Sequence, residues 1–163
     1  MMRWLTAIGP GVGCRRRRSG SGSTPPGEGW NPLAIPWGNE LRPDGEWRCN
    51  IWQRDFPARN TLKDGWLTLA PVHSFEPNGY GLGQTVGNVW EWCSDWYDPS
   101  YYRTSPAEDP TGPRDDSAGS LRVLRGGSYF GHDSSCNRYR HSAKSGNTPD
   151  SSMGNAGFRT VAL

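Results

Sequence analysis

Apolar and polar residues alternate regularly in only a few short stretches of this chain. Residues 86–97 alternate large apolar with polar side chains, a period of two that predicts a strand with aromatic rings on one face. Residues 121–129 show the clearest strand pattern, and the pair Gly126 and Gly127 predicts a bulge or a close backbone approach there. A final short strand is predicted over residues 157–161. We find no long amphipathic pattern that would predict a helix.

Turn residues separate these stretches. The chain has 22 Gly and 14 Pro, which break regular structure almost everywhere. Residues 49–52 are predicted to form a short strand or a buried corner, and residues 98–120, rich in Pro and Asp, a long surface loop. After residue 140 a polar loop, NTPDSS, is predicted. The pattern by itself predicts an irregular domain of short strands.

Composition and charge narrow the class of protein. Apolar residues make up 33% of the chain, and 9 Trp, 6 Tyr and 4 Phe supply much of the apolar area that a core needs. The net charge of +2 favours neither a nucleic-acid partner nor a membrane surface. No run of apolar residues is long enough for a membrane-spanning helix.

The first 30 residues differ from the rest of the chain. Their composition predicts a disordered or non-native segment, followed by one domain over residues 31–163. The basic run Arg15–Arg18 follows the mildly apolar part instead of preceding it, unlike a signal peptide, so we expect the cytoplasm. A solvated tail or a shifted reading frame explains this run better than an anionic partner does.

Cysteine chemistry is a candidate function. Cys14, Cys49, Cys93 and Cys136 show no CxxC spacing, which argues against zinc. Cys136 has His132 and Arg138 nearby in the sequence, which favours a reactive thiol or a soft-metal ligand; a buried, inert cysteine is the commoner alternative. His132 is expected to be a hydrogen-bonding partner, and Cys93, beside Trp92, a core residue.

Oxygen-bearing side chains suggest two further possibilities. Asn50, Asp64 and Glu91 lie near Gly-containing turns, where hard cations find carboxylate and carbonyl ligands. Without EF-hand spacing, side chains that cap turns explain Asn50 and Asp64 better from the residues alone. The Arg and Asn residues of 137–159 suit an extended peptide or a hydrogen-bonded scaffold for irregular backbone, and the sequence leaves both open.

The motifs together resemble the formylglycine-generating enzyme family, also called sulfatase-modifying factors, of bacterial, actinobacterial type. The matching stretches run in family order from about residue 35 to residue 159. They are IPWGNEL, RCNIWQRDFPARNT, APVHSFEPNGYGL, VGNVWEWCSDWYDPSYY, RVLRGGSYFGHDSSCNRYR and NTPDSSMGNAGFR. The resemblance implies an α+β fold of C-type-lectin-like architecture, and the chain would correspond to the C-terminal part of such a domain.

The resemblance also implies a reaction and its cofactors. Family members oxidise a cysteine in a CxPxR-type motif of an unfolded sulfatase polypeptide to Cα-formylglycine, with oxygen and Cu(I) held by two cysteines; soft thiolates suit Cu(I). By position, the implied catalytic residues are Cys136, which would also bind copper, and Ser128. The implied substrate-binding residues are Trp92, His132, Asn147, Asn155 and Arg159.

Structural calcium is implied at two groups of residues, which reverses the preference for turn caps. The first group is Asn50, Ile51, Asp64 and Trp66, with Ile51 and Trp66 offering backbone carbonyls. The second group is Val86, Gly87, Val89 and Glu91.

The sequence departs from the family pattern at its centre. Gly131 stands at the position of the first copper-binding cysteine, so the turn keeps one of two thiolates. The family's N-terminal half is replaced by the low-complexity stretch, so we expect a truncated domain. The alternative to an oxidoreductase is therefore a non-catalytic module of the same fold that binds peptide or glycan.

Overall fold

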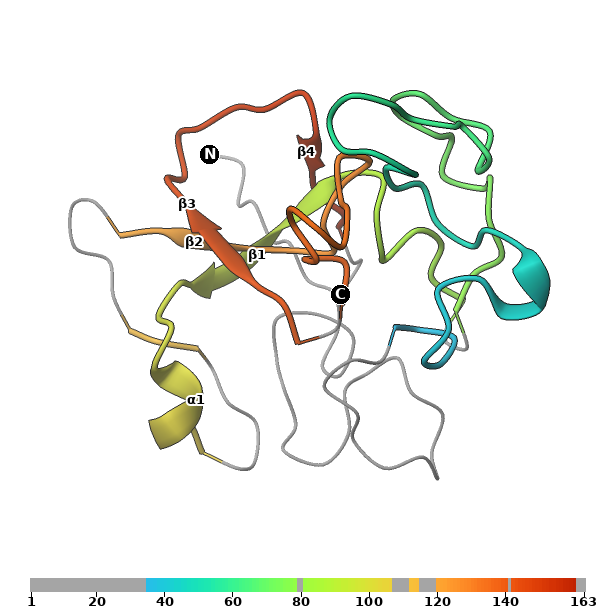
Figure 1. Cartoon of the computed structure of the whole chain (residues 1–163). Helices are drawn as coiled ribbons and strands as arrows, with labels where there is room; N and C mark the ends of the chain where they lie inside the picture. Colours follow the sequence, from blue (N-terminus) through green and yellow to red (C-terminus); the bar gives the residue numbers. More distant parts are fainter. Residues whose placement is uncertain (1–34, 79–80, 107–111, 115–119, 141, 161–163) are drawn as a thin grey trace.

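The computed structural model describes residues 35–78, 81–106, 112–114, 120–140 and 142–160 (Figure 1). The expectation of a disordered segment over residues 1–30 and the domain start at residue 31 lie outside these residues. The elements are the 3-10 turn η1, the strands β1 to β4 and the short helix α1. In chain order their bounds are η1 Pro43–Gly45, β1 Trp90–Trp96, α1 Tyr101–Thr104, β2 Arg122–Arg125, β3 Ser145–Asn147 and β4 Ala156–Gly157.

The four strands form one mixed sheet in the order β3-β2-β1-β4. β1 and β2 are antiparallel, with Trp92 opposite Leu124, and β2 and β3 are antiparallel as well. β4 runs parallel to β1 on its other side, with Trp90 opposite Ala156. Figure 1 shows this sheet crossing one side of the molecule while long connections fill the other side. The predicted α+β class with short strands and extensive loops is confirmed.

Positive backbone φ angles shorten the two predicted strands. The strand expected from residue 86 begins at Trp90, because Gly87 (φ 70°) and Asn88 (φ 59°) turn the chain before it. The strand expected to reach residue 129 ends at Arg125, because Gly126 (φ 85°) and Gly127 (φ 72°) form a turn. The predicted close approach is confirmed: a Cβ on Gly127 would lie 3.1 Å from the Tyr139 backbone nitrogen.

Other local predictions were less accurate. The last strand is only Ala156–Gly157, and residue 161 lies outside the described part. β3 was missed, because Ser-Gly-Asn carries no apolar pattern and pairs through its backbone. The loop predicted over 98–120 contains the helical turn α1. For residues 49–52, by contrast, the second of the two predicted alternatives is confirmed: they form a buried corner, with Cys49, Asn50 and Ile51 almost fully buried.

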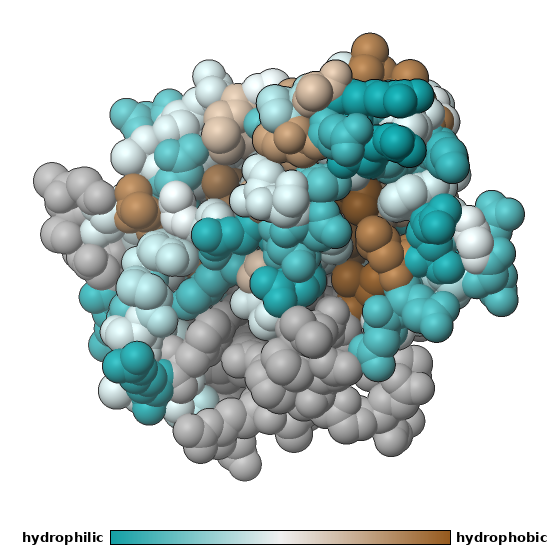
Figure 2. All heavy atoms as spheres, in the orientation of Figure 1, coloured by the Kyte–Doolittle hydropathy of each residue, from teal (hydrophilic) through white to brown (hydrophobic). Residues whose placement is uncertain are grey.

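The apolar core is small. Its largest cluster contains Ile35, Cys49, Ile51, Val86 and Tyr139, with two Trp rings packed against it. Several aliphatic side chains stay exposed in the loop after Trp66, namely Leu67, Leu69 and Val72. Figure 2 shows apolar atoms at the top of the view, over the loops drawn in green in Figure 1. No helix in the described ranges has the length and apolar character that crossing a membrane requires.

Candidate functional site

The segment that follows the double-glycine turn carries most of the implied catalytic residues. Its backbone folds into consecutive tight turns: Gly131 N–H donates to the Ser128 carbonyl at 2.7 Å, and Cys136 N–H donates to the His132 carbonyl at 2.8 Å. The Gly131 carbonyl accepts a hydrogen bond from Trp52 N–H at 3.0 Å, which attaches the turn to the buried corner. Residues 128–136 are thus held in place by backbone bonds instead of by apolar packing. We call residues 128–136 the cysteine turn.

Ser128 faces inward. Its side chain is 2% exposed, and its Oγ accepts hydrogen bonds from Asn155 Nδ2 at 3.0 Å and from Phe130 N–H at 3.3 Å. The Asn155 carbonyl accepts a bond from Trp90 N–H at 2.8 Å, so Asn155 connects the cysteine turn to the first residue of β1. The structure therefore brings two implied site residues, Ser128 and Asn155, into direct contact.

His132 and Cys136 share the outer side of the turn. The His132 ring nitrogen Nδ1 lies 2.7 Å from Ser134 Oγ and 3.1 Å from an Asp133 carboxylate oxygen, and the ring stacks on Phe56 at 6.2 Å. The expectation that His132 is a hydrogen-bonding partner is confirmed. Cys136 is a free, half-buried thiol and so differs from a fully buried, inert cysteine.

The other described cysteines do not supply a second thiolate. Cys49 is 1% exposed inside the core, and burial, together with the nearby charge of Asp64, raises the pKa of its thiol far above the ordinary value. Cys93 is disulfide-bonded and buried within β1, in line with the core position predicted for it. Cys136 is therefore the free thiol that the described residues offer at this surface.

Gly131 occupies a tight but unstrained position. A Cβ there would lie 3.0 Å from the Ser128 carbonyl oxygen, 3.2 Å from Tyr139 Cδ1 and 3.7 Å from Ile51 Cγ2. Its φ lies outside the left-handed region, so backbone conformation does not demand glycine. A side chain at residue 131 thus needs shifts of only a few tenths of an ångström.

The remaining implied substrate-binding residues lie elsewhere. Trp92 is half-buried on β1. Asn147 Oδ1 accepts bonds from Thr148 N–H at 2.9 Å and Ser151 Oγ at 3.2 Å, so this side chain organises the polar loop. In the described part of the chain no hydrogen bond or ion pair joins either residue to the cysteine turn.

Asp64, from the first implied calcium group, is buried within a shell of backbone donors. It is 9% exposed, its Oδ2 accepts from Ile51 N–H at 3.1 Å, and its Oδ1 accepts from Trp66 N–H at 3.1 Å. Both hydrogen bonds of the Asn50 side chain use Nδ2, which donates to the Thr68 carbonyl and to Asn88 Oδ1. Ile51 and Trp66 therefore meet the Asp64 carboxylate through their N–H groups, the turn-capping arrangement that the residues alone favoured. Within the described residues, no cationic side chain forms an ion pair with this carboxylate.

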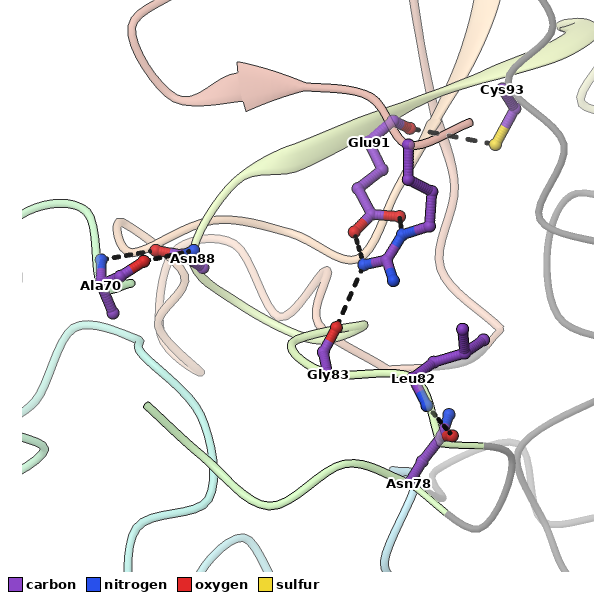
Figure 3. Close-up of polar contacts among 8 residues, drawn as sticks. Ala70, Asn78, Leu82, Gly83, Asn88, Glu91 and Cys93 are labelled. Carbon is purple, nitrogen blue, oxygen red and sulfur yellow. Dashed lines mark hydrogen bonds and ion pairs between the residues drawn. The ribbon is translucent and has the colours of Figure 1, made fainter. Parts of the chain in front are cut away.

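Glu91, from the second implied calcium group, has a cationic partner. Arg159 Nε donates to Glu91 Oε2 at 2.9 Å, Arg159 Nη2 donates to Glu91 Oε1, and Nη2 also donates to the Gly83 carbonyl at 3.2 Å (Figure 3). Burial raises the pKa of Glu91, and the hydrogen bond and charge of Arg159 offset part of that rise. The pair lines a hollow of about 920 Å³ together with Val72, Phe75, Leu82 and Phe158.

Sequence reasoning missed both this ion pair and the role of Asn88. Asn88 Nδ2 donates to the Ala70 carbonyl at 3.1 Å, and Asn88 Oδ1 accepts from Ala70 N–H at 2.8 Å (Figure 3). Asn88 Oδ1 also accepts from Asn50 Nδ2 at 3.1 Å. The signal for Asn88 was a Gly-Asn pair before a strand, since Asn tolerates positive φ and hydrogen-bonds the backbone. The Glu91–Arg159 pair joins residues 68 positions apart, and no local pattern reveals it.

No group of three or more His, Cys, Asp or Glu side chains that could hold a metal ion occurs among the residues that the structure describes. A copper site needs two soft donors, and the cysteine turn offers one. The donor atoms of the cysteine turn therefore do not fit the implied copper site, which has two thiolates. A calcium ion accepts carboxylate, carbonyl and amide oxygens, and Asp64 offers one such carboxylate. Two backbone N–H groups already donate to its oxygens, which is the geometry of a side chain that caps a turn.

Comparison with known proteins agrees with the motifs. The family model described as "Sulfatase-modifying factor enzyme 1-like domain" matches residues 28–162. A formylglycine-generating enzyme of Streptomyces coelicolor is 64% identical over 123 residues, which cover 76% of this chain and 38% of the relative. One of Thermomonospora curvata is 52% identical over 137 residues, covering 82% of this chain and 44% of the relative. The chain thus spans less than half the length of these relatives.

Two further matches bear on fold and activity. A mouse protein named "Inactive C-alpha-formylglycine-generating enzyme 2" is 40% identical over 130 residues, which cover 78% of this chain and 36% of that protein. The solved structure of PvdO from Pseudomonas aeruginosa is 23% identical with a TM-score of 0.55, covering 69% of this chain and 40% of that one. At this level of identity the likeness concerns the fold alone.

Proposed function

The chain belongs to the sulfatase-modifying factor family, and on that footing we propose that it serves sulfatase maturation, by acting on a cysteine of an unfolded sulfatase polypeptide. The observation that carries the proposal is the cysteine turn, in which Ser128, Gly131, His132 and Cys136 are held by backbone bonds and Asn155 fixes Ser128. In the proposed reaction the substrate's Cβ–S bond breaks and Cβ becomes the aldehyde carbon, while the sulfur leaves as hydrogen sulfide. Oxygen takes two electrons from the substrate and two from an external thiol reductant, so that water is the other product.

Cys136 is the proposed copper ligand. Cu(I) would supply the redox chemistry with oxygen, and Cys136 is the residue of the turn suited to bind it. Because residue 131 lacks a side chain, we expect the chain as it stands to bind Cu(I) weakly. His132 contacts Ser134 and Asp133 through Nδ1, so Nε2 is the ring atom that could bind a metal, but an imidazole is a harder donor than the missing thiolate.

The variant Gly131→Cys tests the proposal directly. The new Cβ meets Ser128 O at 3.0 Å and Tyr139 Cδ1 at 3.2 Å, so we expect a cost of about 1 kcal/mol in the free energy of unfolding. Cu(I) affinity, measured by competition with a chromogenic chelator, should rise in Gly131→Cys but not in Gly131→Ala, which adds the same Cβ without sulfur. Equal affinities for the two variants would contradict a copper site at this turn.

Conversion of substrate gives the second measurement. The chain and its Gly131→Cys variant are incubated with Cu(I), air, a thiol reductant and a CxPxR peptide, and the aldehyde is detected by mass spectrometry. We expect conversion to increase in the variant. Aldehyde in neither sample would exclude catalysis by this chain and leave binding as its role.

A non-catalytic module that binds peptide is the second candidate function. Two observations favour it: Gly131 removes one thiol, and the relative named inactive matches most of the chain. This candidate predicts that the CxPxR peptide binds without copper, measured by fluorescence anisotropy against a scrambled peptide. Equal binding of the two peptides would count against it.

The Asp64 group is the proposed structural calcium site. Its support is chemical: a buried carboxylate, the amide oxygen of Asn50 and backbone carbonyls are oxygen donors that calcium accepts. The Val86–Gly87–Val89–Glu91 group is the weaker proposal, because Arg159 already neutralises its carboxylate. Calcium would hold together loops that have little apolar packing of their own.

A further inference from the structure

A second cavity borders the cysteine turn, with His132 and Asp133 of that turn among its lining residues. It has a volume of about 470 Å³, within the range typical of small-molecule sites. Trp47, Trp52, Tyr139 and the His132 ring form its walls, and Ile51 and Gln53 belong to its buried part. Neither the implied copper site nor the calcium groups account for this cavity.

Positive charge dominates the rim of this cavity. Four cationic side chains line it, Arg42, Arg54, Arg59 and Lys63, against the one carboxylate of Asp133 among the described lining residues. Arg54 pairs with Asp55 at 3.5 Å, whereas Arg59 and Lys63 make no ion pair with any residue that the structure describes. Two exposed cations thus remain available to an anion that enters the cavity.

Two indole rings line the same cavity. The indole nitrogen of Trp52 donates to the Arg59 carbonyl at 3.1 Å, whereas that of Trp47 is buried away from the free space and has no hydrogen-bond partner among the described residues. The two rings therefore offer aromatic surface to a ligand. Arg42 lies over the Trp47 ring at 5.3 Å, which adds positive charge beside this wall.

Backbone strain occurs at the same place. Arg54 has a φ of 86°, in the left-handed region that a long side chain rarely adopts. Such conformations persist when the surrounding structure enforces them, and they are concentrated at binding sites. Together with the rim charges and the aromatic walls, this geometry indicates a built site instead of a chance hollow.

We propose that this cavity binds a small organic anion, a carboxylate or sulfonate attached to an aromatic ring. The anionic group would be attracted by Arg59 and Lys63, while the ring packs between the aromatic walls. The carboxylate of Asp133 on the rim repels an anion, and the four basic groups outweigh that repulsion. The proposal does not depend on the sulfatase-maturing role.

Nuclear magnetic resonance of the ¹⁵N-labelled full chain tests this site. Sodium 2-naphthoate is the probe, and 2-naphthamide is the neutral control of nearly the same shape. The Trp47 indole N–H signal is identified by its loss in Trp47→Phe. We expect 2-naphthoate to move this signal saturably and 2-naphthamide to bind at least about fivefold more weakly. Equal affinity for the two probes would overturn the proposal.

Variants that each remove one positive charge test whether 2-naphthoate binds in this cavity. Arg59→Gln and Lys63→Gln each keep much of the side chain and should weaken 2-naphthoate binding by up to about fivefold, as expected for exposed charge pairs. Arg103→Gln, in α1 and outside the cavity lining, is the matched control and should change nothing. An equal loss in all three variants would show non-specific attraction. Tighter binding of an acetylated triglutamate peptide than of 2-naphthoate would also overturn the proposal, in favour of an acidic polypeptide.

Discussion

Asp64 and Glu91 are both buried carboxylates, yet the fold satisfies them in opposite ways. Asp64 receives two neutral backbone N–H groups from residues 2 and 13 positions away, Trp66 and Ile51. Glu91 receives the charged guanidinium of Arg159, 68 positions away. The first arrangement leaves a negative charge that a cation can neutralise, and the second is already neutral. Two groups that the sequence predicts as equivalent calcium sites are therefore electrostatically different.

The comparison also separates local from long-range stabilisation. Asp64 orders the loop in which it lies, so its hydrogen bonds hold the loop from Ile51 to Trp66. Arg159 follows β4 and reaches back to β1 and to the Gly83 carbonyl, so its bonds attach the last described segment to the sheet. The loss of either carboxylate should consequently destabilise different parts of the molecule.

The largest expected effect comes from breaking the Glu91–Arg159 pair. Arg159→Met leaves Glu91 buried without a partner, and removing one member of a buried pair typically costs about 3–5 kcal/mol. Urea denaturation near neutral pH measures the loss. The double variant Arg159→Met/Glu91→Gln should recover a large part of it, because a neutral amide tolerates the site better than an unpaired carboxylate. Equal losses in the single and double variants would show that the ion pair is not the source.

Calcium should then distinguish the two carboxylates. An ion that binds only the folded state adds about 2.7 kcal/mol at a concentration of 100 times its dissociation constant, so we expect calcium to raise the melting temperature. Asp64→Asn should abolish most of this increase, whereas Glu91→Gln, at the carboxylate that Arg159 occupies, should retain most of it. Differential scanning fluorimetry with calcium and with chelator measures both. The reverse ranking would show that calcium displaces Arg159.

Local signals predicted the places where the chain turns, and they did so for a physical reason. Gly126 and Gly127 were expected to permit a close backbone approach, and they do, because only a residue without a Cβ fits against the Tyr139 backbone with positive φ. The alternation in residues 86–97 identified β1 because its side chains alternate between buried and half-buried positions. The family motifs likewise predicted the α+β fold of short strands.

What the sequence could not reveal depends on pairing between distant residues. β3 forms because Gly146 lies opposite Val123, and no apolar pattern marks it. Arg159 was implied as a substrate-binding residue, and no local pattern marks its bonds to a carboxylate on β1 and to the Gly83 carbonyl. The cavity lined by Ile51, Trp52 and His132 likewise forms only where the corner at residues 49–52 meets the cysteine turn. Such contacts follow from topology, which short-range patterns do not encode.

A smaller effect concerns pH, and its sign follows from the cause of the shift. Burial raises the pKa of Glu91 above its ordinary value, so the folded state binds a proton more readily than the unfolded state does. The free energy of unfolding should therefore fall as pH rises from the ordinary carboxyl range through the raised pKa, where the buried group becomes charged. Arg159 limits this fall because it stabilises the charged form.

Comparing variants across pH isolates the Glu91 contribution. Urea denaturation from about pH 4 to about pH 8 should show a decline in wild type that is absent in Glu91→Gln and steeper in Arg159→Met, whose carboxylate has no counter-ion. Asp64→Asn is the matched control: it removes a buried carboxylate elsewhere and should retain the Glu91-dependent decline. The opposite result would be a free energy of unfolding that rises with pH in wild type and in Asp64→Asn but stays constant in Glu91→Gln. That result would mean that the attraction of Arg159 outweighs the effect of burial on Glu91. The carboxylate would then be held charged throughout, and the contrast between the two sites would rest on the partner alone.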